Sequence, residues 1–223
     1  MTISEAIRQR KSIRDFKPDP VSQDVLREIL ETACRAPSAM NTQPWKFVVV
    51  TGEALERIKR ENIEKLRAGE KFNSEYWAIG WSGDSVYRQR QVSLAKQIFQ
   101  LMDINREDAK KRSEWMERGF RYFNAPAVII ILTDKMLKES TPFLDIGAVM
   151  QNICLAALDY GLGTCIGDQG VMYPEVLRKH CDIPESDMIV ISIAVGYPNH
   201  GFPANKLQSS RESLDTLTKW CND

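Results

Sequence analysis

The chain has 223 residues, which suits one domain with a full hydrophobic core, or one domain with a large insertion. Thirty acidic and thirty basic side chains give a formal net charge of zero, so no overall field favours nucleic acid or an anionic membrane. The five cysteines include no Cys-x-x-Cys pair, a usage typical of reduced thiols rather than of disulfides or a zinc site. The chain opens with a charged amphipathic pattern and contains no apolar run of about 20 residues, so we expect a cytoplasmic protein that does not cross a membrane.

Two hydrophobic periodicities alternate along the chain. Apolar residues three or four positions apart predict helices, and β-branched runs bounded by glycine or proline predict buried strands. The helical patterns cover 4–10, 22–36, 53–66, 88–102, 106–123, 141–158 and 173–180, with a short helix after about residue 210. Ser4 is the predicted N-cap of the first of these helices. The strand patterns cover 46–51, 127–133, 164–167 and 187–197.

Two segments differ from the rest in composition. Residues 67–124 combine glycines with several aromatic residues ahead of two helical patterns, the second with Asn105 as its N-cap. We interpret this segment as a lid or helical insertion within a single domain that spans 1–223. The 141–158 pattern, with Thr141 as its N-cap, is apolar on nearly all sides, so we expect its helix at the centre of the fold or at a dimer interface.

A polar turn, Ala36-Pro-Ser-Ala-Met-Asn-Thr-Gln-Pro-Trp45, separates the second helix from the first strand. Most turns of this composition are only capped connections. The short polar side chains between the two prolines can also hydrogen-bond a ligand.

A basic cluster follows the first helix, where Arg10, Ser12 and Arg14 alternate. In an extended segment this spacing places all three side chains on one side. Two guanidinium groups and a hydroxyl suit a phosphate, because arginine donates bidentate, charge-assisted hydrogen bonds. The alternative is a solvated basic turn.

The sequence contains none of the common acid–base, triad or metal motifs. Neither His180 nor His200 has a partner at catalytic or ligand spacing, and no Gly-x-Gly-x-x-Gly fingerprint follows a strand. Cys165 could be a nucleophile, but a core cysteine is the simpler interpretation. An enzyme with this sequence must therefore use a cofactor for its chemistry.

Four stretches together resemble the flavin site of the nitroreductase family, the FMN-dependent NAD(P)H oxidoreductases. These stretches are 10–14, 36–45, 161–167 and 210–211. The tail from Pro203 to Leu214 and the long 67–124 segment resemble the branch that includes nitrobenzoate-type nitroreductases. The resemblance implies an α+β nitroreductase-like fold, in which a central mixed β-sheet is wrapped by helices and two chains form an intertwined homodimer with FMN at the interface.

The resemblance also assigns site residues. The implied cofactor-binding residues are Arg10, Lys11, Ser12, Arg14, Pro37, Ser38, Ala39, Asn41, Gln151, Cys165, Ile166, Gly167 and Arg211. The backbone of Ile166 and Gly167 would face flavin N5, Arg14 would lie near the pyrimidine edge, and no side chain or metal would itself be catalytic. Many relatives carry a second basic residue where this chain has Ser209, so phosphate binding would depend more on Arg10 and Arg14, or on Lys206.

The implied reaction is ping-pong. NAD(P)H reduces FMN and leaves, and a small oxidised acceptor such as a nitroaromatic or a quinone takes its place. Tyr76, Trp77 and Trp81 would form a substrate gate, or would only pack the insertion onto the core. The rival functions are a dehalogenase or flavin-cleaving enzyme of the same superfamily, and a redox-sensing flavin protein without turnover.

Overall fold

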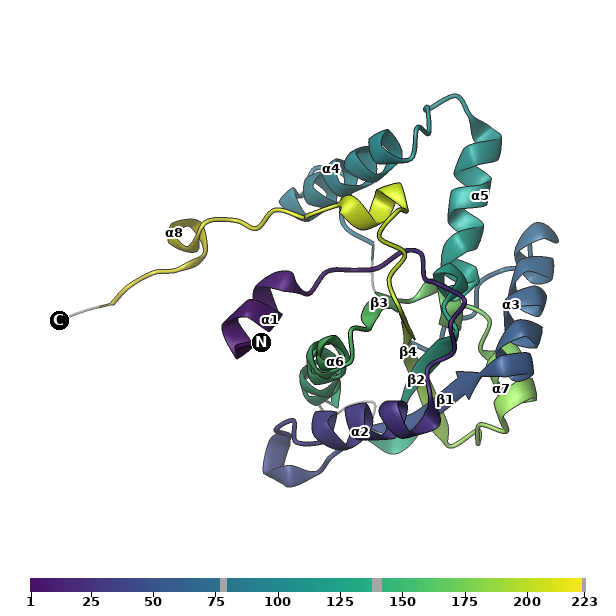
Figure 1. Ribbon diagram of the computed structural model, residues 1–223, viewed down its shortest axis with the longest axis vertical. Helices are drawn as coiled ribbons and strands as arrows, with labels where there is room; N and C mark the ends of the chain where they lie inside the picture. The colour runs from purple at the N-terminus through teal and green to yellow at the C-terminus, as the bar shows by residue number, and fades with distance from the viewer. Residues whose placement is uncertain (77–79, 138–141, 222–223) are drawn as a thin grey trace.

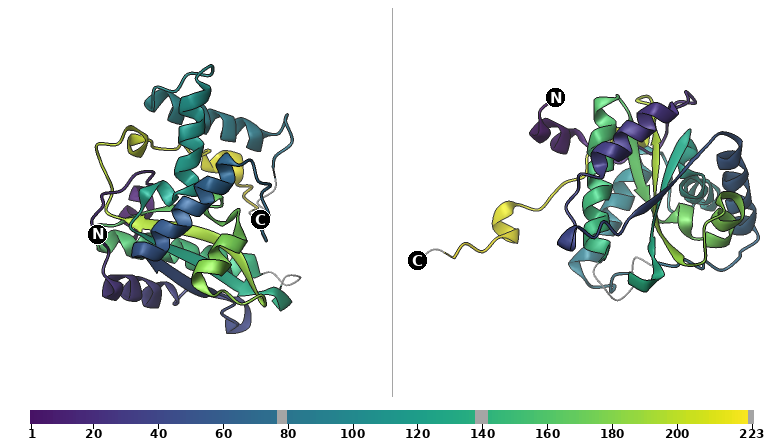
Figure 2. Two further views of the ribbon diagram at one scale, coloured as in Figure 1. Left: turned by 90° about the vertical axis from the view of Figure 1, so that its right-hand side faces the viewer. Right: turned by 90° about the horizontal axis from the view of Figure 1, so that it is seen from below.

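The computed structural model describes residues 1–76, 80–137 and 142–221. A four-stranded sheet lies at its centre with helices on both faces (Figures 1 and 2). The strands are β1 (Lys46–Thr51), β2 (Ala127–Asp134), β3 (Gly163–Gly167) and β4 (Asp187–Gly196). The helices are α1 (Ile3–Gln9), α2 (Gln23–Ala33), α3 (Gly52–Arg67), α4 (Val86–Leu101), α5 (Ala109–Phe120), α6 (Pro142–Asp159), α7 (Pro174–Cys181) and α8 (Leu214–Leu217). The α+β class and the predicted order of elements are confirmed.

The expectation of a mixed sheet is wrong for the described chain. The strand order is β1-β2-β4-β3, and every one of these neighbours pairs antiparallel. The parallel pairing among the described residues is an isolated bridge between Ser12 and Thr164, at the outer edge of β3. Being an edge strand, β1 is also less covered than predicted, since Val50 is its one buried residue.

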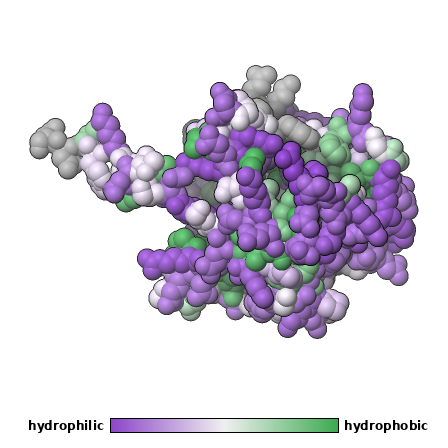
Figure 3. Space-filling view, turned by 90° about the horizontal axis from the view of Figure 1, so that it is seen from above, coloured by the Kyte–Doolittle hydropathy of each residue, from purple (hydrophilic) through white to green (hydrophobic). Residues whose placement is uncertain are grey.

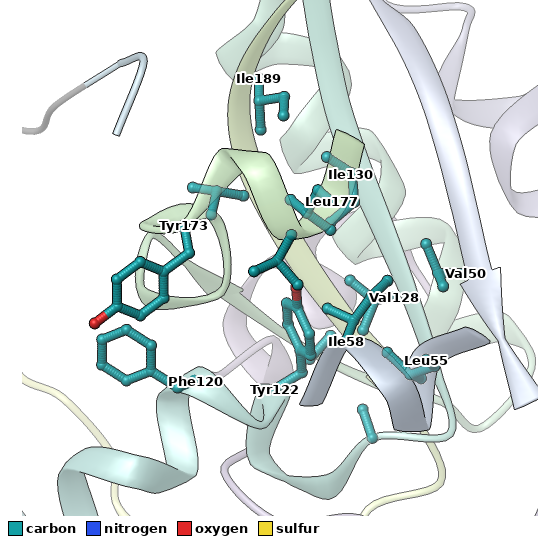
Figure 4. Packing of buried hydrophobic residues seen from close by; sticks show 14 of the residues in the cluster. Val50, Leu55, Ile58, Phe120, Tyr122, Val128, Ile130, Tyr173, Leu177 and Ile189 are labelled. Carbon is teal, nitrogen blue, oxygen red and sulfur yellow. The ribbon is translucent and has the colours of Figure 1, made fainter. Parts of the chain in front are cut away.

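Strand β2 divides the core into two halves. Val128, Ile130 and Leu132 face a cluster under α3, α5 and α7, whereas Ala127, Ile129 and Ile131 face α2 and α6. Figure 4 shows the first cluster, in which side chains from β1, β2 and β4 meet residues of α3, α5 and α7. Strict alternation along β2 explains why its continuous apolar run is buried on both sides.

A β-bulge interrupts β4. Ile131 pairs with Ile191 while Leu132 pairs with Ile189, so Val190 is the extra residue on the β4 side. The bulge resets the alternation, because Val190 and Ile191 both contribute to the cluster under α2 and α6. The N-terminal part of β4 extends beyond β3, whose pairing with β4 begins at Ser192.

Helix ends follow local capping chemistry, which corrects two predicted caps. Thr2, rather than Ser4, caps α1 in a capping box with Glu5. Asp108, rather than Asn105, caps α5 by accepting a hydrogen bond of 2.9 Å from the Lys111 amide. The predicted cap Thr141 lies outside the described residues.

Helix α6 is only partly covered within one chain. Val149, Ile153 and Ala157 are fully buried against α2 and the sheet, but Leu144 is 75% exposed. Further uncovered apolar residues lie on α1 and on the tail, which extends away from the body of the chain (Figures 1 and 3). They are Ile3, Ile7, Leu214, Leu217 and Trp220.

Among the described residues, no helix is long and apolar enough to cross a membrane. Within the same ranges, no cluster of three or more histidine, cysteine or acidic residues could hold a metal ion. All five cysteines are free thiols.

Candidate functional site

The basic cluster lies along the free edge of β3. Ser12 forms the parallel bridge to Thr164, and the Ile13 amide donates a hydrogen bond of 2.9 Å to the Thr164 carbonyl. Gly163 permits this approach, because a Cβ atom there would lie 2.5 Å from Cγ1 of Ile13. The basic cluster at 10–14 and the 161–167 turn therefore form one structural unit.

Electrostatics around Cys165 show how closely these groups converge. Burial raises the pKa of the Cys165 thiol to about 11, while the charges of Arg14 and Arg10 and the Ser12 hydroxyl act in the opposite direction. The thiol is 5% exposed and stays protonated near neutral pH. Cys165 is thus a core residue of β3, while the neighbouring Ile166 and Gly167 are half-buried.

A cavity of about 890 Å³ opens beside this unit. It is bounded by the end of α1, the α6–β3 turn and the tail. Among its described lining residues, four are cationic and none is acidic. The cationic residues are Arg8, Arg10, Lys11 and Arg211. Such a lining attracts an anion of the size of a phosphate ester.

The tail supplies the far wall of the cavity. Arg211 and Ser209 both line it, and Arg211 Nη1 donates to Ser209 Oγ at 2.8 Å. Lys11 Nζ donates to the Asn205 carbonyl at 2.6 Å, which ties the basic cluster to the same tail. Lys206, the alternative suggested by the sequence, is not among the lining residues.

The polar turn lies elsewhere on the chain. The Ala39 amide donates to Asp145 Oδ2 at 3.2 Å, in the first turn of α6, whereas the cavity contacts Leu158 in the last turn. Thirteen residues of helix separate these two contacts, a distance of about 20 Å. Within one chain, the predicted residues Pro37, Ser38, Ala39 and Asn41 therefore do not meet the basic cluster, and Gln151 lies half-buried on α6 between the two groups.

Unusual backbone angles support a functional interpretation of the turn. Met40, Asn41 and Gln43 have φ of 50°, 60° and 48°, a region that non-glycine residues seldom adopt. Ser38 Oγ holds this geometry by accepting a hydrogen bond of 3.0 Å from the Gln43 amide. Met40 is nonetheless 98% exposed, so the described part of the chain leaves this side chain of the strained segment uncovered.

Comparison with known proteins identifies the family. The nitroreductase family model matches residues 7–197, which include the basic cluster, the polar turn and β3. The chain belongs to the nitroreductase family. It is 35% identical to a nitrobenzene nitroreductase of Ectopseudomonas oleovorans, over 99% of this chain and 97% of that one. It is 27% identical to a 4-nitrobenzoate reductase of Pseudomonas putida, over 95% and 92% of the two chains.

Solved structures agree with the fold of this nitroreductase. The FMN and NADPH-dependent nitroreductase NfnB of Sphigopyxis sp. strain HMH superposes with a TM-score of 0.94 over the whole of both chains, at 25% identity. NfnB of Mycobacterium smegmatis, solved in complex with NADPH, has a TM-score of 0.91 at 23% identity, over 98% and 97% of the chains. At 23% identity, the similarity to the Mycobacterium smegmatis protein shows a shared fold and no more.

The structure describes two of the three predicted gate residues of the nitroreductase, Tyr76 and Trp81. Tyr76 stacks on Phe143 at the start of α6, with ring centroids 4.2 Å apart. Trp81 is 53% exposed and contacts Tyr87 at 5.2 Å between centroids. Trp77 lies outside the described residues. Trp81 thus does not pack into the core. Phe72 is 46% exposed but stacks on the buried Phe120, with ring centroids 5.7 Å apart.

Glu75 fixes the base of the segment that carries the gate residues, a role that the sequence did not predict. Glu75 accepts a hydrogen bond of 2.7 Å from the Ile189 amide and one of 2.6 Å from Arg178. It covers the part of β4 that extends past β3, next to the bulge. No periodicity marks an isolated glutamate in a loop, so only the three-dimensional structure reveals its role.

Proposed function

We propose that this nitroreductase is an FMN-dependent oxidoreductase that takes hydride from NAD(P)H and reduces nitroaromatic, quinone or related small acceptors. The observation that carries the proposal is the cavity beside β3, whose described lining residues include four cationic ones and no acidic one. The names of the relatives support the same class of reaction. FMN, when bound, supplies the transfer of two electrons that the side chains of this chain cannot perform.

The residues present fit a flavin mononucleotide. Arg10, Lys11 and Arg211 line the cavity and would neutralise the phosphate. Ser12 is not a lining residue, but it pairs with Thr164 beside the cavity, and its hydroxyl would bind the ribityl chain of the flavin. Arg14 would place its positive charge near the pyrimidine edge, where charge accumulates on reduction. The half-buried backbone of Ile166 and Gly167 would lie against the flavin ring.

We also propose that the active form is a homodimer. Leu144 on α6 and Trp220 in the tail are 75% and 70% exposed in the single chain, and a partner would cover them. The strained turn lies about 20 Å along α6 from the cavity of its own chain. The partner's copy of that turn would complete the site, which explains why the turn is uncovered here.

Three further parts of the proposal concern the surroundings of the site. The segment that contains Tyr76, Trp77 and Trp81 would gate access for flat acceptors, and 67–124 would be an insertion within one domain that spans 1–223. The free thiols are consistent with a cytoplasmic location.

One set of measurements tests the proposal. The protein should purify yellow with about one FMN per chain, and anaerobic NADPH or NADH should bleach the flavin. Nitrobenzene, 4-nitrobenzoate and a quinone should then restore the colour with turnover. Bleaching without reoxidation by any of them would favour a flavin-binding sensor, and turnover on halogenated phenols alone would favour a dehalogenase. A colourless protein that does not bind added FMN would refute the proposal.

A further inference from the structure

The backbone of Arg14 is held at both of its polar groups by side chains from distant segments. Its amide donates a hydrogen bond of 2.6 Å to Asn205 Oδ1, and its carbonyl accepts one of 3.0 Å from Arg118 Nη2. Asn205 follows the last strand by nine positions, and Arg118 lies in the last turn of α5. We call the segment 10–14, which would hold the flavin, the cradle. Its pairing with β3 ends at Ile13, so the side chains of Asn205 and Arg118 fix the cradle beyond that point.

A second set of contacts holds Arg118 and Asn205 in place. The same Arg118 nitrogen forms an ion pair with Asp15 Oδ1, and both side chains are mostly buried. Asn199 Nδ2 donates to Asp15 Oδ2 at 2.7 Å, and Asn205 Nδ2 donates to the Asp15 carbonyl at 2.8 Å. The guanidinium of Arg118 also lies over the Phe202 ring, 4.3 Å from its centroid.

We propose that Arg118 is a positioning residue for the cofactor, through which the helical insertion holds Arg14 in the flavin cradle. The inference rests on the proposed function, and it adds a route by which α5 influences flavin binding and not only acceptor access. Arg118 would touch no flavin atom. Its charge is already matched by Asp15, and two of its contacts are to the backbone of the cradle and to the carboxylate beside it.

The neighbouring position on α5 offers a comparison on the same helix. Glu117 accepts two hydrogen bonds from Arg67, of 2.7 and 2.9 Å, and so ties the same helix to α3 instead of to the cradle. Both ion pairs join α5 to the core, and both lose a charge-assisted contact when the arginine is truncated. Only the Arg118 pair continues to Arg14. The Arg67 side chain is 68% exposed and that of Arg118 is 16% exposed. A purely structural role for Arg118 therefore predicts a larger loss of stability in its truncation, but no loss of FMN affinity in the folded protein.

The test compares Arg118→Ala, Arg118→Lys and Arg67→Ala. Each protein is freed of flavin and titrated with FMN, with the quenching of flavin fluorescence as the readout. We expect Arg118→Ala to weaken FMN binding about ten-fold or more, because one charge-assisted contact to the cradle is lost. Arg118→Lys should recover part of the loss, and Arg67→Ala should stay within about two-fold of the parent even if its melting temperature falls as much.

A second readout separates positioning from general loosening. With Arg14 displaced, the midpoint potential of bound FMN should become more negative in Arg118→Ala and remain unchanged in Arg67→Ala. If Arg118→Ala does not fold, Asp15→Asn, which keeps the side-chain shape and removes the charge, replaces it in both assays. Equal losses in the Arg118 and Arg67 variants, or no change in FMN affinity and potential, would overturn the inference. Failure of the parent protein to bind FMN would instead refute the proposed function.

Discussion

Replacing Gly163 by alanine tests whether the contact between β3 and the basic cluster positions the cofactor. The added Cβ would lie 2.5 Å from Cγ1 of Ile13 and 2.9 Å from Cγ of Pro198. Carbon atoms normally approach to about 3.5–4.0 Å, so Ile13 must move by about 1 Å. Ile13 lies between Ser12 and Arg14, and the cradle must move with it.

This displacement should lower both the stability of the protein and its affinity for FMN. Overpacking of this kind costs about 1–3 kcal/mol of unfolding free energy. In a domain of this size, that loss corresponds to a fall in melting temperature of about 2–12 °C. Weakening one charge-assisted hydrogen bond to the phosphate should raise the FMN dissociation constant about ten- to hundred-fold.

Thermal denaturation and FMN titration measure both effects, with Gly167→Ala as a control on the same strand. A Cβ at Gly167 meets no protein atom within 4 Å, so that variant should melt like the parent. If the flavin ring lies against Gly167, its FMN affinity should still fall, which separates a direct clash from a displaced cradle. Unchanged stability and FMN affinity in Gly163→Ala would refute the argument that β3 positions the cradle.

Further predictions concern the cradle, the interface, the gate and the buried thiol. Arg10→Glu should release FMN from a folded protein, since a carboxylate repels a phosphate; full occupancy on purification would contradict the assignment. Leu144→Asp should leave the chain folded, because this side chain is 75% exposed, yet give a monomer by sedimentation; an unaltered dimer would exclude α6 from the interface. Trp81→Ala should change kcat/KM unevenly among acceptors with little change in melting, whereas a loss of about 3 kcal/mol or more would show that it only packs. Burial raises the pKa of the Cys165 thiol to about 11, above its value in the unfolded chain. The stabilisation that the buried, protonated thiol provides should therefore be complete below the unfolded pKa and be lost as the pH rises toward about 11. The unfolding free energy of Cys165→Ala, measured across this pH range, should not show that loss.

Most of the fold was predictable because its signals are local. The four strands are β-branched runs with glycine or proline at their ends, and eight helical patterns match eight helices within a few residues. Boundaries were wrong where backbone geometry overrode periodicity. The helix predicted to reach residue 123 ends at Phe120, because Tyr122, Phe123 and Asn124 all have positive φ.

The direction of strand pairing and the distant contacts were not predictable from such patterns. A continuous apolar run shows that a strand is buried, but not whether its neighbour runs parallel, so the mixed sheet was a wrong inference from the resemblance. Asp15 and Arg118 lie 103 positions apart, and each alone is an ordinary surface residue by its sequence context. Their pairing depends on the packing of α5 beside the cradle.

Cofactor binding and assembly are two aspects of one equilibrium if the polar turn of one chain completes the site of another. FMN would then bind the dimer better than the monomer, and by thermodynamic linkage FMN must strengthen the dimer by the same factor. Arg10 and Leu144 act at opposite ends of α6, yet each substitution should weaken both binding and association, because each removes one side of the shared site. The strained, uncovered backbone at Met40 and Asn41 fits this arrangement, since a conformation costly in the free chain is best maintained where a partner and a ligand both restrain it.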